Sequence, residues 1–269
     1  MKKGYWACSV LLSILLGIVW LADLFLWHDL QTGFITKGDI WVRYLLFMVP
    51  LFPIVSFSPP AKGEFRTLYG EKNKAIRLFL NLCAGIFVLC GLYGLVQNAL
   101  ASKIANAVLG VLCVLMGVWL YRFKVCLSEK IETPTKTVFG GFGLCLYFYG
   151  VLTVRFLGKP SSLHRLIPTV HTLSGVAAIG FVFVLILGSY LPGEKLKGRK
   201  VYIWGQLCFL FGLCLTLPIA VYEVMMKSQS ILSVIISLLP EMLFGILGAA
   251  VSYKMFPPKE ESFSQRYEV

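Results

Sequence analysis

The sequence predicts an all-α protein, a polytopic bundle of about eight membrane-spanning helices. Of its 269 residues, 58% are hydrophobic and only 14% are charged, and the mean hydropathy is +0.79. Soluble domains carry about 25% charged residues, so the excess of apolar surface in this chain must face lipid. Eight apolar stretches approach the roughly 20 residues that a helix needs to cross a bilayer. Eight such spans leave no room for a separate soluble domain.

The predicted spans form a single transmembrane domain over residues 1–256, followed by a flexible cytoplasmic tail at 257–269. Because lipid offers no hydrogen bonds to the backbone, and because the apolar runs are continuous rather than alternating, each span must be a helix. The first run exceeds the 7–15 apolar residues of a signal peptide, so we expect it to remain uncleaved. The spans cover residues 6–27, 40–57, 78–97, 104–121, 138–154, 166–191, 201–221 and 231–253.

The distribution of Lys and Arg predicts that both termini lie in the cytoplasm. With the N-terminus inside, 18 of the 25 Lys and Arg residues fall in cytoplasmic segments and 7 fall outside. Basic residues favour the cytoplasmic side of membrane proteins, and we expect a plasma membrane of the bacterial type. The basic excess behind the formal net charge of +12 then lies mostly in cytoplasmic segments that face anionic lipid headgroups. It does not indicate a nucleic-acid partner.

Prolines and glycines predict how the spans bend and pack. Pro50 and Pro53 in the second span, Pro168 in the sixth and Pro240 in the eighth lack a backbone donor and should kink or interrupt their helices. Glycines at short spacings should let neighbouring helices approach closely. They are Gly91 and Gly94, Gly110 and Gly117, Gly140, Gly143 and Gly150, Gly175 and Gly180, and Gly245 and Gly248.

Glu241 is the leading candidate for a functional residue. It lies near the centre of the eighth predicted span and directly follows Pro240. A charged side chain at a helix centre costs roughly 2.5–3.5 kcal/mol on insertion scales. A carboxyl group at this depth is therefore protonated, paired with a cation or wetted by a cavity. The structural alternative is a neutral glutamic acid that hydrogen-bonds to a neighbouring helix.

Further polar residues cluster at the outer ends of the predicted spans. With Glu241 as its floor, this set predicts a polar vestibule that opens outward. The alternative is that each side chain extends independently to the lipid headgroups. The set comprises Asp23, Arg43, Gln97, Asn98, Arg155, His171 and Glu223.

The sequence predicts no metal and no cofactor. His164 and His171 are seven residues apart in one segment and His28 lies in an outer loop, which does not suit haem ligation from two sides. A metal site built from His164, His171 and a carboxylate lacks the usual ligand spacing. The chain also contains no H-E-x-x-H, P-loop, C-x-x-C or G-x-S-x-G motif and no dinucleotide-binding fingerprint.

These patterns favour a small-molecule transporter, a permease or a membrane-embedded substrate-binding subunit over an enzyme. Its binding or coupling residues would be Glu241, Asp23, Arg43, Arg155, His171 and Glu223, and Glu241 would carry the proton in a proton-coupled form. One alternative is a membrane enzyme that acts on a lipid or lipid-linked substrate from the outer leaflet. Another is a sensor or assembly partner whose basic loops dock a soluble protein.

Overall fold

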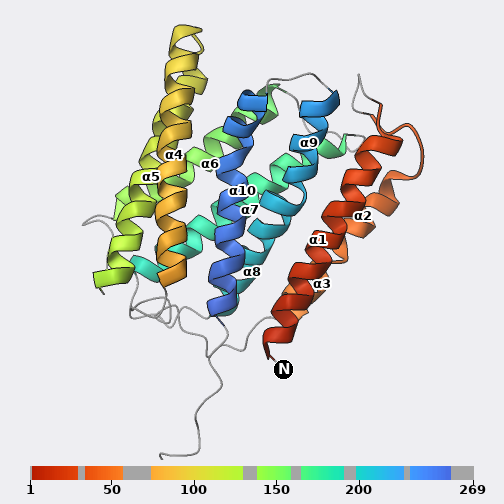
Figure 1. Ribbon diagram of the computed structural model, residues 1–269, viewed down its shortest axis with the longest axis horizontal. Coiled ribbons are helices and arrows are strands. Elements are labelled where there is room, and N and C mark those ends of the chain that lie inside the picture. The colour runs from red at the N-terminus through yellow and green to blue at the C-terminus, as the bar shows by residue number, and fades with distance from the viewer. Residues whose placement is uncertain are drawn as a thin grey trace, which may run out of the picture.

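The computed structural model is a bundle of helices (Figure 1). It describes residues 2–29, 34–56, 74–129, 138–158, 165–190, 198–226 and 231–255, and every regular element within these ranges is helical. In chain order the elements are α1 (Lys2–Trp27), α2 (Ile40–Met48), α3 (Leu51–Ser56), α4 (Lys74–Leu100), α5 (Ile104–Glu129), α6 (Val138–Gly158), α7 (Leu166–Tyr190), α8 (Gly198–Phe209), the π-helix η3 (Leu210–Cys214), α9 (Thr216–Met226) and α10 (Ile231–Lys254).

Six stretches of helix are long and apolar enough to cross a membrane, which confirms the predicted helical class and is consistent with a membrane protein. The two remaining predicted spans, 40–57 and 138–154, correspond to shorter apolar helices at Ile40–Ser56 and Cys145–Leu157. The six long stretches are Gly4–Trp27, Lys74–Leu100, Ile104–Leu127, Leu166–Tyr190, Gly198–Met225 and Ile231–Lys254.

The structure shows an interrupted helix at one of the three proline-containing spans. The second predicted span is interrupted, because α2 ends at Met48 and α3 starts at Leu51, with Pro50 in the turn between them. Pro240 does not interrupt α10, which runs from Ile231 to Lys254, and a kink at this position stays a prediction. Pro168 is the third residue of α7, where a missing N–H removes no intrahelical hydrogen bond.

The helices α4 and α5 form an antiparallel hairpin along one edge of the bundle, and α1, α2 and α3 lie at the opposite edge (Figure 1). Gly91 of α4 permits the hairpin to close tightly, because a Cβ at this position would lie 2.7 Å from the backbone nitrogen of Val114. Gly94, one turn further on, faces open space. Of these two glycines, only Gly91 is therefore needed for helix contact.

The centre of the bundle depends on close contact between α8 and α10. Gly205 and Gly248 meet backbone to backbone, so neither position has space for a side chain. The start of α1 joins the same end of the bundle, where the indole Nε1 of Trp6 donates to the carbonyl of Ala249 at 3.2 Å. The first residues of α1 and the last turn of α10 therefore lie at one end (Figure 1).

The seventh predicted span contains a π-helix that the sequence pattern does not reveal. The N–H of Leu215 bonds to the carbonyl of Leu210 at 3.0 Å, five residues back. The hydroxyl of Thr216 donates to the carbonyl of Phe211 at 2.7 Å, also five residues back. Short π-helical insertions within α-helices occur frequently at functional sites, and this one lies beside α10.

Candidate functional site

An ion pair between α6 and α10 joins a buried carboxylate to a partly exposed guanidinium group. Nη1 of Arg155 donates to Oε1 of Glu241 at 2.6 Å. The Glu241 side chain is 1% exposed and that of Arg155 is 25% exposed. Removing the Glu241 charge from water is costly, and only good geometry with further hydrogen bonds offsets that cost. The Glu241 carboxylate is accommodated at this depth because Arg155 supplies the opposite charge.

Two further hydrogen bonds hold the pair in place. Oγ of Ser174 on α7 donates to Oε2 of Glu241 at 3.1 Å, so both carboxylate oxygens accept a hydrogen bond. Nη2 of Arg155 donates to the backbone carbonyl of Ser237 at 3.2 Å. The site therefore joins three helices through a single carboxylate.

The positions of both charged residues suit their helices. Arg155 lies in the last turn of α6, where the negative end of the helix dipole stabilises a cation. Glu241 lies well inside α10, directly after the proline. Arg155 therefore extends from the end of one helix, and Glu241 projects from the interior of another. The pair links a partly exposed side chain to a buried one.

Aromatic rings close the site on one side. Phe244 lies three residues after Glu241 on α10, and its ring centroid is 5.1 Å from that of Phe148 and 5.2 Å from that of Phe181. All three rings are fully buried. This aromatic cluster therefore lies within one turn of Glu241 along α10.

The π-helix runs along the other side of Glu241. A Cβ at Gly212 would lie 3.1 Å from the backbone carbonyl of Glu241. Across the same contact, a Cβ at Gly245 would lie 3.1 Å from the backbone nitrogen of Leu213. The backbones of η3 and α10 thus meet at the level of the ion pair.

A second buried ion pair joins α1 to α2. Nε of Arg43 donates to both carboxylate oxygens of Asp23 at 3.0 Å, and Nη2 lies 2.9 Å from Oδ1. Nη2 also donates to the carbonyl of Lys37 at 2.8 Å and Nη1 to that of Asp39 at 3.3 Å. One guanidinium group therefore fixes the segment before α2 onto the end of α1.

His28 completes this second cluster, although the sequence places it only in an outer loop. Its Nδ1 lies 3.2 Å from the carbonyl oxygen of Asp23 and 3.4 Å from a carboxylate oxygen of the same residue. Burial lowers the pKa of His28 below 6.5, and the neighbouring Arg43 acts in the same direction, while Asp23 opposes them. A neutral imidazole that donates through Nδ1 fits this arrangement.

The polar contacts divide the predicted vestibule residues into two groups. Arg155 and Glu241 form one, and Asp23 and Arg43 form the other. Convergence into a single vestibule stays a prediction. The four other predicted residues lie as follows: Gln97 is exposed on α4, Asn98 bonds to the carbonyl of Gly94 within that helix, and His171 of α7 and Glu223 of α9 are half-buried.

Sequence reasoning missed Ser174 and His28. Ser174 is three residues after His171 and so lies near it on the surface of α7. A polar residue at that spacing inside an apolar span was the available signal. For His28, no local pattern indicates contact with Asp23, since a loop residue can turn in any direction.

Within the described ranges, no group of three or more His, Cys, Asp and Glu side chains could hold a metal ion. Among known proteins, no family model, no curated protein and no solved structure matches this chain.

Proposed function

We propose that this protein is a proton-coupled transporter of a small anionic solute, with the Arg155–Glu241 pair as its coupling site. In this proposal the chain crosses a plasma membrane of the bacterial type eight times, and α2 with α3 and α6 form the two shorter crossings. Both termini lie in the cytoplasm. The start of α1 and the end of α10 at one end of the bundle support an even number of crossings, and the distribution of Lys and Arg supports the orientation.

The observation that carries the proposal is the salt bridge between the buried carboxylate of Glu241 and Arg155. An ionisable group within a membrane span is costly, and such groups mark ion and substrate pathways. The π-helix beside Glu241 and the proline before it supply the irregular backbone that transporters use at their binding sites.

The chemistry of the pair suggests how a proton and an anion could be coupled. When Glu241 is ionised, it accepts hydrogen bonds from Arg155 and Ser174 and neutralises the guanidinium charge. When Glu241 takes up a proton, Arg155 loses its counter-charge and can bind a carboxylate or phosphate group of the solute. Release of the proton restores the salt bridge and displaces the anion. Proton uptake by Glu241 and anion binding by Arg155 therefore require each other.

The test uses purified protein in liposomes that contain a pH-sensitive dye. Glutamate, succinate or inorganic phosphate is added outside at acidic pH, with an alkaline lumen, and proton entry is recorded. We expect at least one of these anions to drive proton entry with the wild type and none to do so with Glu241→Gln. The matched control is Glu129→Gln at the end of α5, which should retain the wild-type rate.

Infrared spectroscopy provides a readout that does not depend on the solute. Acidification of the wild type should produce the band of a protonated carboxyl group, and Glu241→Gln should lack that band. Anion-driven proton entry that survives in Glu241→Gln would refute the coupling role of this residue. Anion flux without proton movement in the wild type would refute proton coupling.

A further inference from the structure

The face of α10 that carries Glu241 is polar and exposed toward the N-terminal end of the helix. Ser233 and Ser237 precede Glu241 at successive intervals of four residues, so the three side chains lie on one face. Ser233 and Ser237 are exposed, whereas Glu241 is 1% exposed. An exposed polar surface therefore leads along about 12 Å of helix to the buried carboxylate.

Arg155 borders this exposed surface. Its Nη2 donates to the backbone carbonyl of Ser237 at 3.2 Å, and its Nη1 donates to Oε1 of Glu241 at 2.6 Å. The Arg155 side chain is itself partly exposed. One guanidinium group thus contacts both the exposed serine and the buried carboxylate, so an anion that reaches Ser237 meets a cation beside Glu241.

Beyond Glu241, the same face of α10 is buried. Phe244 follows within one turn, and its ring packs on those of Phe148 from α6 and Phe181 from α7. The buried residues on this face are Phe244, Gly248, Val251 and Ser252. Within the described part of α10, this face is therefore exposed before Glu241 and buried after it.

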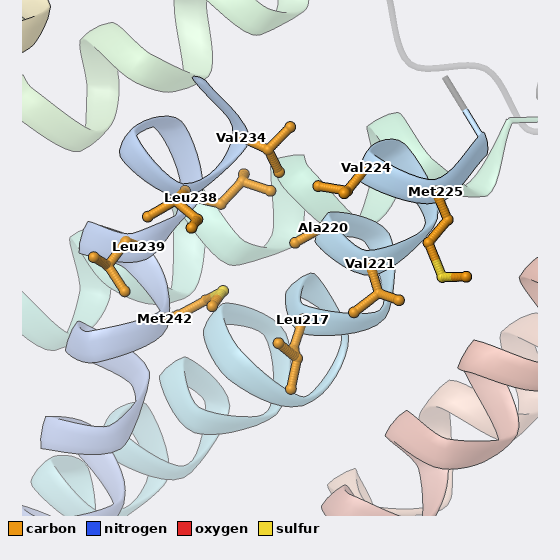
Figure 2. A pocket seen from close by; sticks show the side chains of 10 residues that line it. Leu217, Ala220, Val221, Val224, Met225, Val234, Leu238, Leu239 and Met242 are labelled. Atoms are coloured by element: carbon orange, nitrogen blue, oxygen red, sulfur yellow. The ribbon is translucent and has the colours of Figure 1, made fainter. Parts of the chain in front are cut away.

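The face of α10 that lies opposite α9 provides no polar surface. Figure 2 shows the two helices facing one another with side chains that contain only carbon and sulfur. Val234, Leu238 and Met242 line this side of α10. A polar solute finds no hydrogen-bond partner among these side chains. Of these two faces of α10, only the one with the serines offers hydroxyl groups along the approach to Glu241.

We propose that water and solute reach the Arg155–Glu241 pair from the N-terminal end of α10, along Ser233 and Ser237, and that the packing around Phe244 closes the path toward the other end. This inference rests on the proposed transport function and identifies the side from which the solute enters. With both termini in the cytoplasm, the N-terminal end of α10 is the outer end. The site then receives its solute from outside.

The first test measures reaction with a membrane-impermeant methanethiosulfonate that carries a sulfonate group, in right-side-out vesicles. Such a reagent modifies thiols that water reaches, and mass spectrometry of the peptide distinguishes the introduced thiol from the native ones. Ser237→Cys keeps the backbone carbonyl that Arg155 contacts and should react at least tenfold faster than Ile235→Cys. Ile235 is the matched control, because it is 45% exposed and lies two residues away on the apolar face. Equal rates in the two variants would overturn the path.

The second test repeats the reaction in inside-out vesicles. Ser237→Cys should react at least tenfold more slowly there than in right-side-out vesicles. Lys200→Cys, at an exposed position near the start of α8, should show the reverse and so verifies the orientation of the vesicles. Equal rates for Ser237→Cys from both sides would overturn the closure around Phe244. Faster reaction from the inside would overturn entry from the outer end.

A third test connects the path to transport. Modification of Ser237→Cys should reduce anion-driven proton entry into liposomes at least tenfold, and Ile235→Cys treated in the same way should keep it. Proton entry that modification leaves unchanged would overturn the path as the route of the solute. The two labelling tests need no solute, so they can fail while the coupling test with Glu241→Gln succeeds. If no anion drives proton entry even in the wild type, the transport function itself is refuted.

Discussion

Nη1 of Arg155 lies 2.6 Å from Oε1 of Glu241, although the two residues are 86 positions apart in the chain. The contact supplies the counter-charge for Glu241, whose side chain is 1% exposed, whereas that of Arg155 is 25% exposed. Without Arg155, an ionised Glu241 would be a buried charge with no counter-charge. Variants that remove one charge or both charges test whether the pair serves stability, function or both.

Arg155→Met should destabilise the protein by roughly 3–5 kcal/mol, because it leaves Glu241 buried without a counter-charge. The double variant Arg155→Met with Glu241→Leu should recover most of that loss, since it buries no charge. Thermal unfolding in detergent measures both. If the single variant is as stable as the double variant, the carboxylate does not depend on Arg155.

Ser174→Ala should cost about 1.5–3 kcal/mol, because it removes a hydrogen bond to a charged group. Ser56→Ala at the exposed end of α3 should change stability by less than about 0.5 kcal/mol. Thermal unfolding of the two variants provides the comparison. Equal effects would mean that the contact between Ser174 and Glu241 contributes nothing specific.

Arg43→Lys should loosen the junction between α1 and α2. A lysine cannot reproduce the paired contacts of the guanidinium with Asp23 or its bonds to two carbonyl groups at once. We expect faster proteolysis before α2 and a loss of about 2–4 kcal/mol in stability. Arg199→Lys, on the exposed surface of α8, is the control. Unchanged proteolysis in Arg43→Lys would contradict the role of these bonds.

The stability of the protein should fall on acidification through a contribution from His28. Its pKa is below 6.5 in the folded protein, chiefly because of burial, so the unfolded chain binds the proton more readily. The contribution is present above pH 6.5 and is lost as the pH falls from 6.5 toward the lowered pKa. Melting temperatures between pH 8 and 5 should depend less on pH in His28→Gln. If the melting temperature of His28→Gln depends on pH as strongly as that of the wild type, groups other than His28 cause the effect.

Two glycines one turn apart in α4 should respond in opposite directions to alanine. Gly91→Ala places a Cβ against the backbone of α5 and should destabilise the hairpin by about 1–3 kcal/mol. Gly94→Ala meets nothing within 4 Å and should be neutral or gain up to about 1 kcal/mol from helix propensity. Thermal unfolding of both variants decides the point. Equal destabilisation would contradict the inference that Gly91, and not Gly94, is needed for the contact between α4 and α5.

The sequence alone was sufficient to predict a helical membrane protein and to locate its long helices. Both follow from local properties, since twenty consecutive apolar residues need a helix in lipid wherever they occur. The break at Pro50 is also local, because proline lacks a backbone donor. Glu241 could be selected from the sequence because a carboxyl group within an apolar span is costly regardless of its neighbours.

Only the tertiary structure decided which residues meet Glu241. Arg155, Ser174 and the π-helix come from three other segments of the chain, and the apolar sequence between them does not encode helix order. Helices in lipid associate through close packing rather than through exclusion of water, so their neighbours depend on fitted surfaces such as Gly205 against Gly248. For the same reason the sequence does not reveal that Asp23 pairs with Arg43.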